Sequence, residues 1–186
     1  EVEHTMAHSS TSLHGPEFLK LKIRHVADFP KPGILFYDIT TLLCEPEGFK
    51  AAIDQLALPF VGAGIDVVVG IESRGFILGG AVADRLGVGF CPIRKPGKLP
   101  AKTVRESFSL EYGTDAIEMH EDAIAAGQRV LVVDDVLATG GTAAAAMSLV
   151  KQLGGHLSAL AFLIELDFLH GRDKLPGEHV VSVLHY

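Results

Sequence analysis

The chain has 186 residues, of which 48% are hydrophobic, and its formal net charge is −7. This composition excludes a disordered chain and suffices for one domain with a complete core. The acidic balance argues against nonspecific nucleic-acid binding, because a phosphate backbone would be repelled, so we expect small-molecule partners.

Hydropathy and cysteine spacing narrow the class of protein further. No apolar run reaches the roughly 18 residues of a membrane span, and no export signal is recognisable, so we expect a cytoplasmic protein with no membrane partner. Cys44 and Cys91 form no C-x-x-C pair, which predicts reduced thiols and neither a disulfide nor a zinc site. The scattered histidines also predict no direct protein ligation of a metal.

The amino-terminal part is predicted to hold a tail and a short helix. Residues 1–12 are polar and lack periodicity, so we interpret them as a loose or added tail outside the fold. Residues 13–186 are interpreted as a single domain. Within it, apolar residues at mixed helical spacing favour a short amphipathic helix over 17–26.

Two prolines and a glycine then prescribe a rigid, extended segment at residues 30–33. They present Leu35, Phe36 and Tyr37 at a controlled angle. Either these side chains pack on the core, or Phe36 stacks on a flat heterocycle.

The middle of the chain alternates strand and helix patterns. Residues 48–58 predict a helix, 66–71 a buried strand, and the following Gly- and Ala-rich segment a helix ending near Leu86. The polar turn between the last two contains Ser73 and Arg74. Arg74 either forms a surface ion pair or, beside a helix N-terminus, grips an anionic leaving group.

A strand over 88–93 precedes a long basic loop at 94–105, which holds five cations among prolines and glycine. Such a run is usually a solvated surface. In an acidic protein it can also close over an anionic substrate and exclude water. Beyond it, alternation over 108–112 and 117–119 predicts a hairpin arm, with Glu111 pointing outward.

The most informative stretch is residues 130–142. Four apolar residues predict a buried strand, and Asp134 and Asp135 follow where the chain is expected to leave the core. The small residues after them let backbone N–H groups converge on an anion at the start of a helix over 143–153: Ala138, Thr139, Gly140, Gly141 and Thr142. The competing interpretation is a turn capped by aspartates. A phosphorylated sugar would suit both the carboxylates and the cradle.

Further strands are predicted over 157–164 and, at a sheet edge, over 180–184. Together the elements predict an α/β fold with a mainly parallel central sheet flanked by helices. Because strand, polar turn and helix occur twice, we expect both turns at the carboxyl edge of that sheet, where ligands bind.

Four motifs in this order resemble type I phosphoribosyltransferases. VLVVDDVLATGGT resembles the family's motif for 5-phosphoribosyl-1-pyrophosphate (PRPP), and ESR its pyrophosphate loop. DFPKPGILFYDITTLL is similar to the base-binding hood of adenine phosphoribosyltransferases, and RKPGKLP with SLEYGT to their flexible loop. The resemblance implies the type I phosphoribosyltransferase fold with a small hood at about residues 13–40, and a non-proline cis peptide within 72–74.

The resemblance also implies a reaction, in which PRPP and adenine give AMP and pyrophosphate with Mg²⁺ held mainly through PRPP and water. Asp134, Asp135 and residues 138–142 would bind the ribose phosphate. Glu111 would handle the purine proton. The implied pyrophosphate ligands are Ser73, Arg74, Arg94, Lys95 and Lys98, and the implied adenine site is Leu35, Phe36 and Tyr37, the last at a position that is Arg in some relatives.

Alternatives to adenine phosphoribosyl transfer stay open at this point. The nearest is transfer to another base, such as hypoxanthine, guanine or xanthine. A more distant one is a PRPP-sensing regulator without catalysis, which would be expected to carry a basic DNA-binding segment. The resemblance further implies a homodimer, in which the loop cations could serve the neighbouring subunit.

Overall fold

The computed structural model of the chain describes residues 14–109 and 113–186. These residues form two compact units, with the boundary after Ala51, inside helix α3 (Pro46–Ala57). In the described ranges, no helix combines the length and the apolar character that crossing a membrane requires.

The first unit is built around an antiparallel strand pair. It contains α1 (Pro16–Lys20), β1 (Arg24–Ala27), β2 (Leu35–Asp38) and α2 (Thr40–Leu43). In the register of the pair, Val26 lies opposite Phe36 and Arg24 opposite Asp38. The predicted helix over 17–26 is therefore wrong in its second half, where the chain forms β1.

The reason is a set of tertiary contacts that the helical spacing could not reveal. The Arg24 guanidinium donates to the Asp38 carboxylate from Nη2 at 2.6 Å and from Nε at 3.0 Å. Hydrogen bonds from the Thr40 hydroxyl and N–H, together with Arg24, lower the pKa of Asp38 to about 2. Pairing with β2 thus overrides a weak helical pattern.

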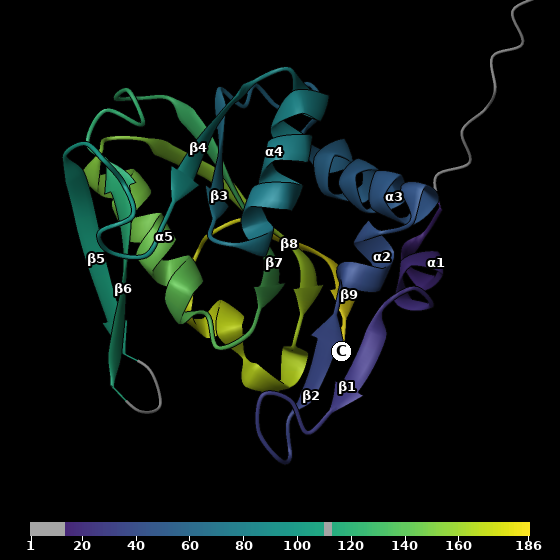
Figure 1. Ribbon diagram of the computed structural model, residues 1–186. Helices are drawn as coiled ribbons and strands as arrows, with labels where there is room; N and C mark the ends of the chain where they lie inside the picture. Colours follow the sequence, from purple (N-terminus) through teal and green to yellow (C-terminus); the bar gives the residue numbers. More distant parts are fainter. Residues whose placement is uncertain (1–13, 110–112) are drawn as a thin grey trace, which may run out of the picture. The chain divides into compact units, whose positions relative to one another are not determined.

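The second unit is organised on a five-stranded sheet (Figure 1). The strand order is β4, β3, β7, β8, β9, and every neighbouring pair is parallel. The strands are β3 (Val67–Ile71), β4 (Gly89–Ile93), β7 (Arg129–Leu137), β8 (His156–Glu165) and β9 (Val180–His185). This confirms the predicted α/β fold and the placing of the last strand at an edge.

Helix α4 (Arg74–Leu86) packs very closely on β3. A Cβ at Gly79 would lie 3.3 Å from the Cα of Gly70, and a Cβ at Gly70 would lie 2.8 Å from the carbonyl oxygen of Gly75. Glycines at these positions let two backbones meet without intervening side chains. The start of α4 is thereby held against the end of the strand.

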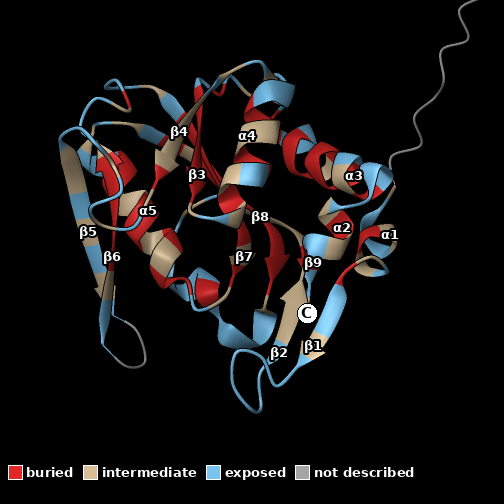
Figure 2. Ribbon diagram, viewed as in Figure 1, coloured by how far each residue is buried: buried red, intermediate tan, exposed pale blue. Residues whose placement is uncertain are grey.

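Helix α5 (Gly141–Gln152) covers a core that also takes residues from the arm β5 (Thr103–Ser109) and β6 (Thr114–His120). Alternate residues of β3, namely Val67, Val69 and Ile71, belong to this core. Figure 2 shows the central strands as almost continuously buried, as expected for a parallel sheet covered on both faces.

Two predicted boundaries shift. Strand β7 continues through Asp134 and Asp135 to Leu137, because β8 runs beside it and pairs Asp134 with Phe162 and Val136 with Ile164. The carboxylates therefore lie within the strand. The predicted basic loop over 94–105 ends at Lys102, since β5 starts at Thr103 and pairs with β6.

The topology places the two polar turns together. Strands β3 and β7 are adjacent and parallel, with Gly70 opposite Val133, so the segments that follow them meet at one edge of the sheet. The predicted cis peptide is confirmed at Glu72–Ser73, in the first of these segments.

Candidate active site

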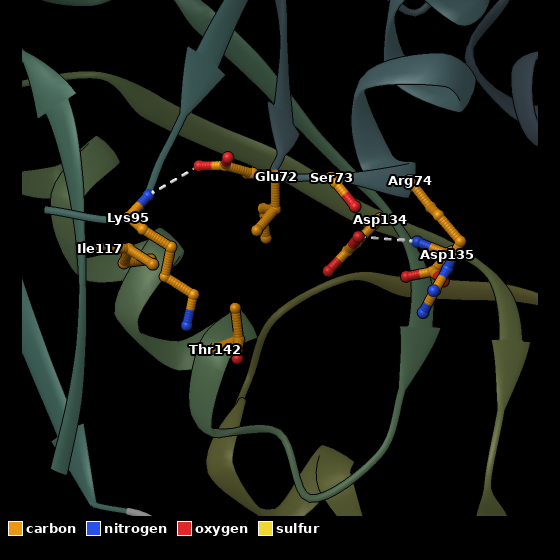
Figure 3. A pocket seen from close by; sticks show the side chains of 9 residues that line it. Glu72, Ser73, Arg74, Lys95, Ile117, Asp134, Asp135 and Thr142 are labelled. Atoms are coloured by element: carbon orange, nitrogen blue, oxygen red, sulfur yellow. Dashed lines mark hydrogen bonds and ion pairs between the residues drawn. The ribbon is translucent and has the colours of Figure 1, made fainter. Parts of the chain in front are cut away.

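A cavity of about 220 Å³ opens where β3 and β7 end. Figure 3 shows side chains from both segments turned toward it. It is lined by Ile71, Glu72, Ser73, Arg74, Lys95, Ile117, Asp134, Asp135 and Thr142. The predicted pyrophosphate turn and the predicted ribose site thus share one cavity.

Two neighbouring carboxylates on β7, those of Asp134 and Asp135, line this cavity. The N–H of Asp135 donates to Oδ1 of Asp134 at 2.9 Å, while the Asp135 carboxylate pairs with the guanidinium of Arg74. Burial, and then the neighbouring Asp135 charge, raise the pKa of Asp134 well above its ordinary value. A ligand that donates hydroxyl protons to Asp134 would offset the lost hydration.

A second, smaller cavity of about 80 Å³ lies beside the first and shares Asp134 and Thr142 with it. Its other lining residues include the whole predicted phosphate cradle, Ala138 to Gly141. Gly140 precedes α5 with a φ of +81°, and no described side chain caps this helix. The N–H groups of its first turn therefore offer donors and a positive helix end to an anion.

Glu72 organises the start of the basic loop, a role that sequence reasoning missed. Its carboxylate accepts from Arg94 Nη2 at 3.0 Å and from the N–H of Lys95 at 3.0 Å. Both hydrogen bonds lower the pKa of Glu72, and the one from Arg94 has the larger effect. Glu72 directly follows the apolar strand β3, just as Asp134 directly follows the apolar run 130–133. This similarity in the sequence could have identified Glu72 as a site residue.

Two further carboxylates hold the same loop. The Glu118 Oε2 accepts from the N–H of Gly97 at 3.1 Å, and the Asp115 carboxylate pairs with Lys95. The hydrogen bond from Lys95 is the main reason that the pKa of Asp115 is lowered. Glu118 gave no sequence signal, because it stands in a run of four buried residues that lacks strand alternation.

The predicted pyrophosphate ligands are only partly brought together. Ser73, Arg74 and Lys95 line the larger cavity. Arg94 and Lys98 are not among its lining residues: Arg94 is bonded to Glu72, and its Nη1 donates to the carbonyl oxygen of Lys98 at 3.3 Å.

The predicted adenine residues belong to the first unit. Leu35, Phe36 and Tyr37 lie on β2, and the rings of Phe29 and Phe36 meet edge to face with centroids 5.1 Å apart. A bond of 2.7 Å from the Gly33 N–H to Oδ1 of Asp28 closes the loop before them. Glu111, the predicted catalytic residue, lies outside the described residues.

Comparison with known proteins identifies the family of the chain. Residues 46–181 match the model of the phosphoribosyl transferase domain. An adenine phosphoribosyltransferase of Acidobacterium capsulatum is 60% identical, covering 91% of this chain and 94% of the relative.

Solved structures give the same result. The crystal structure of adenine phosphoribosyltransferase from Thermoanaerobacter pseudethanolicus superposes with a TM-score of 0.90 at 49% identity, covering 92% of this chain and 99% of the other. The Saccharomyces cerevisiae enzyme, complexed with an imino-altritol bisphosphate and adenine, gives 0.87 at 44% identity and covers 91% and 98%. The chain therefore belongs to the phosphoribosyltransferase family, in the branch formed by the adenine phosphoribosyltransferases.

Proposed function

We propose that the chain is a purine-salvage transferase that moves the 5-phosphoribosyl group from PRPP to adenine, giving AMP and pyrophosphate. The observation that carries this proposal is the meeting of the cradle after β7 and the turn after β3 around one pair of aspartates. PRPP carries a phosphate at C5 and a diphosphate at C1 of its ribose. The cradle would take the first group and the turn after β3 the second, with the aspartates at the ribose between them.

The ribose phosphate half is assigned to β7 and the start of α5. Asp134 and Asp135 accept hydrogen bonds from the two ribose hydroxyls, and N–H groups from Ala138 to Thr142 bind the 5-phosphate. Holding both ends of the sugar fixes C1 in position, which removes much of the entropic cost of the reaction.

The diphosphate half is assigned to the turn after β3 and the basic loop. Ser73, Arg74 and Lys95 contact the departing pyrophosphate, with Arg94 and Lys98 completing the set when the loop closes. The C1–O bond to pyrophosphate breaks and the C1–N bond to adenine forms, so the cations stabilise charge on the leaving group as the sugar becomes cationic.

Mg²⁺ fits this site through its oxygen-rich donor set, because Glu72, Asp134 and Asp135 line the cavity. We assign the ion mainly to PRPP and water, and the carboxylates of Asp134 and Asp135 would hold it through water. When bound it neutralises part of the diphosphate charge.

The base half is assigned to β2 and the arm. Phe36 stacks on adenine, backbone groups at Leu35 read the amino edge, and Tyr37 borders the site. Glu111 accepts the proton that the purine nitrogen loses. The yeast relative, whose structure holds adenine with a sugar bisphosphate analogue, supports this choice of base.

The test is incubation with PRPP, Mg²⁺ and each base in turn, with nucleotide products separated by chromatography. AMP is the expected product, and a site that bonds the amino edge rejects 6-oxopurines by about 10⁴-fold. Preference for hypoxanthine, guanine or xanthine would support the alternative transferase. PRPP binding without any nucleotide product would support the regulator.

Three further expectations form part of the proposal. Residues 13–186 act as one functional domain whose hood, about residues 13–40, serves the base, and residues 1–12 contribute nothing. The protein works in the cytoplasm. It forms a homodimer, which size-exclusion chromatography with light scattering would detect as twice the mass of one chain.

A further inference from the structure

The phosphate cradle rests on a turn from a distant part of the chain. A Cβ at Gly140 would lie 2.2 Å from the carbonyl oxygen of Gly171, and a Cβ at Gly171 would lie 2.4 Å from that of Ala138. Neither separation admits a side chain, so the backbones are in direct contact on both sides. The cradle residues Ala138 to Gly140 therefore take their position from the short helix η3 (Gly171–Lys174).

An ion pair attaches this segment to the central sheet. Arg172 Nε and Nη2 donate to the two carboxylate oxygens of Glu165, each at 2.7 Å, and Nη1 donates to the carbonyl oxygen of Val180 at 3.2 Å. Glu165 is the last residue of β8 and Val180 the first of β9. One side chain thus joins the turn to two strands of the rigid sheet.

The electrostatics favour a fixed rather than a loose attachment. The Glu165 side chain is only 6% exposed. Burial is the largest single influence and would raise the pKa of Glu165, but the hydrogen bonds from Arg172 and Ser182, together with the charges of Arg172 and His185, outweigh it and the pKa is lowered. A parallel two-bond geometry orients the guanidinium as well as attracting it, which an ammonium group would not achieve.

We propose that the Glu165–Arg172 pair is a positioning device for the 5-phosphate, acting through Gly171 on the cradle. This inference rests on the proposed function, and neither residue is assigned contact with the substrate. Loss of the pair releases the turn, the cradle relaxes away from its contact with Gly171, and the N–H donors lose their common focus. Pyrophosphate, which is bound by residues after β3 and β4, is unaffected.

The test measures two ligands separately by isothermal titration calorimetry: ribose 5-phosphate and magnesium pyrophosphate. Arg172→Ala is expected to raise the Kd of ribose 5-phosphate about tenfold, equivalent to about 1.4 kcal/mol, while the pyrophosphate Kd stays within about twofold. Arg172→Lys is expected to fall between wild type and Arg172→Ala, and Gly171→Ala to reproduce the selective loss. In turnover assays the KM for PRPP rises and the KM for adenine does not.

Arg85→Ala is the matched control, because Arg85 also pairs with a buried carboxylate, Asp54, and is 51% exposed against 47% for Arg172. Arg85 lies in the last turn of α4, at the other end from Arg74. It is expected to lower the melting temperature without selective loss of either ligand.

Equal weakening of both ligands in Arg172→Ala would show a general structural role and overturn the inference, as would unchanged binding of both. Arg172→Lys and Gly171→Ala give the same discrimination if Arg172→Ala does not fold. Failure of the wild-type protein to bind ribose 5-phosphate would instead contradict the proposed function itself.

Discussion

At the scale of single residues, Asp134 shows a conflict between stability and ligand binding. Its carboxylate lies next to Asp135, and the nearby cation, Arg74, forms its ion pair with Asp135. Burial and the Asp135 charge therefore destabilise the charged form of Asp134 more than the Asp135 N–H and Arg74 stabilise it. Such a group is expected where a ligand, and not the fold, supplies the compensating interactions.

Asp134→Asn should stabilise the protein at neutral pH and weaken its binding of PRPP. The folded protein holds the Asp134 proton more tightly than the unfolded chain, where the pKa is about 3.9. Ionisation above that pH therefore costs folding free energy, and Asn removes this cost. We expect a higher melting temperature at pH 7 to 8, no gain near pH 3, and a KM for PRPP raised about tenfold or more.

The control for this change is Asp84→Asn, at an exposed position on α4. This change should alter neither the melting temperature nor the KM for PRPP. A lower melting temperature for Asp134→Asn at neutral pH would contradict the assigned direction of the pKa shift.

Glu111→Gln should lower kcat while PRPP affinity stays near that of the wild type. A positioned general base contributes about 10²- to 10⁴-fold to the rate, and Gln keeps the shape but cannot take the proton. Pre-steady-state and steady-state assays with adenine and PRPP measure both quantities. Glu121→Gln, at an exposed position after β6, is the comparison, and equal turnover in the two variants would remove Glu111 from the mechanism.

At the scale of elements, the site depends on how closely α4 approaches the sheet. A Cβ at Gly75 would lie 2.7 Å from Oδ1 of Asp134 and 3.1 Å from the carbonyl oxygen of Val133. The first turn of α4 thus contacts the acidic pair directly. The basic loop is also held by tertiary contacts, with the carboxylates of Glu72, Asp115 and Glu118.

Gly75→Ala should destabilise the protein by about 1 to 3 kcal/mol, because the added methyl group has no space. It should also displace Asp134 and weaken PRPP binding. Denaturant unfolding and calorimetry measure the two effects. Gly80→Ala on the same helix has no atom within 4 Å of the new methyl group, so it should leave PRPP binding unchanged and raise stability by about 0.5 to 1 kcal/mol.

Asp115→Asn should bind pyrophosphate more tightly. Lys95 is paired with Asp115, and a ligand phosphate must displace that carboxylate. Because a partly exposed pair contributes at most about 1 kcal/mol, we expect a Kd lowered about two- to fivefold. Calorimetry with magnesium pyrophosphate measures it, with Lys95→Met as the opposite case, and weaker binding by Asp115→Asn would refute the competition.

At the scale of the whole molecule, a formal charge of −7 coexists with a site that binds anions. We therefore expect the attraction to be local and to come from Arg74, Lys95 and the N-termini of α4 and α5, which lie at one sheet edge. The sheet makes this possible, because the ends of parallel strands all meet there.

A dimer would let the basic loop serve a neighbour, and mixing experiments can detect this. Neither Glu111→Gln nor Lys95→Met should turn over well alone. If Lys95 acts across the interface, subunit exchange between them should restore about a quarter of the wild-type activity, since half of the dimers are mixed and each has one intact site. Lack of recovery, with exchange verified by mass spectrometry of tagged subunits, would place Lys95 in the site of its own chain.

Local patterns in the sequence were sufficient to predict the sheet strands and the tight turn that precedes α5. A run of apolar residues such as 130–133 is typical of a strand buried on both faces, and glycines such as Gly140 are favoured where a backbone turns tightly with positive φ. The alternation of strand and helix then predicted one sheet edge for both turns. Patterns of this kind depend on near neighbours in the chain.

The tertiary structure decided the features that depend on distant partners. Arg24 joined a strand because Asp38 lay opposite it, β7 lengthened because β8 ran beside it, and Lys95 was positioned by Glu72 and Asp115. The only sign in the sequence of the contact between Gly171 and the cradle is the adjacent pair Gly171 and Arg172. Hydrogen bonds and ion pairs between residues far apart in the chain carry no periodicity, so only the folded molecule reveals which of them form.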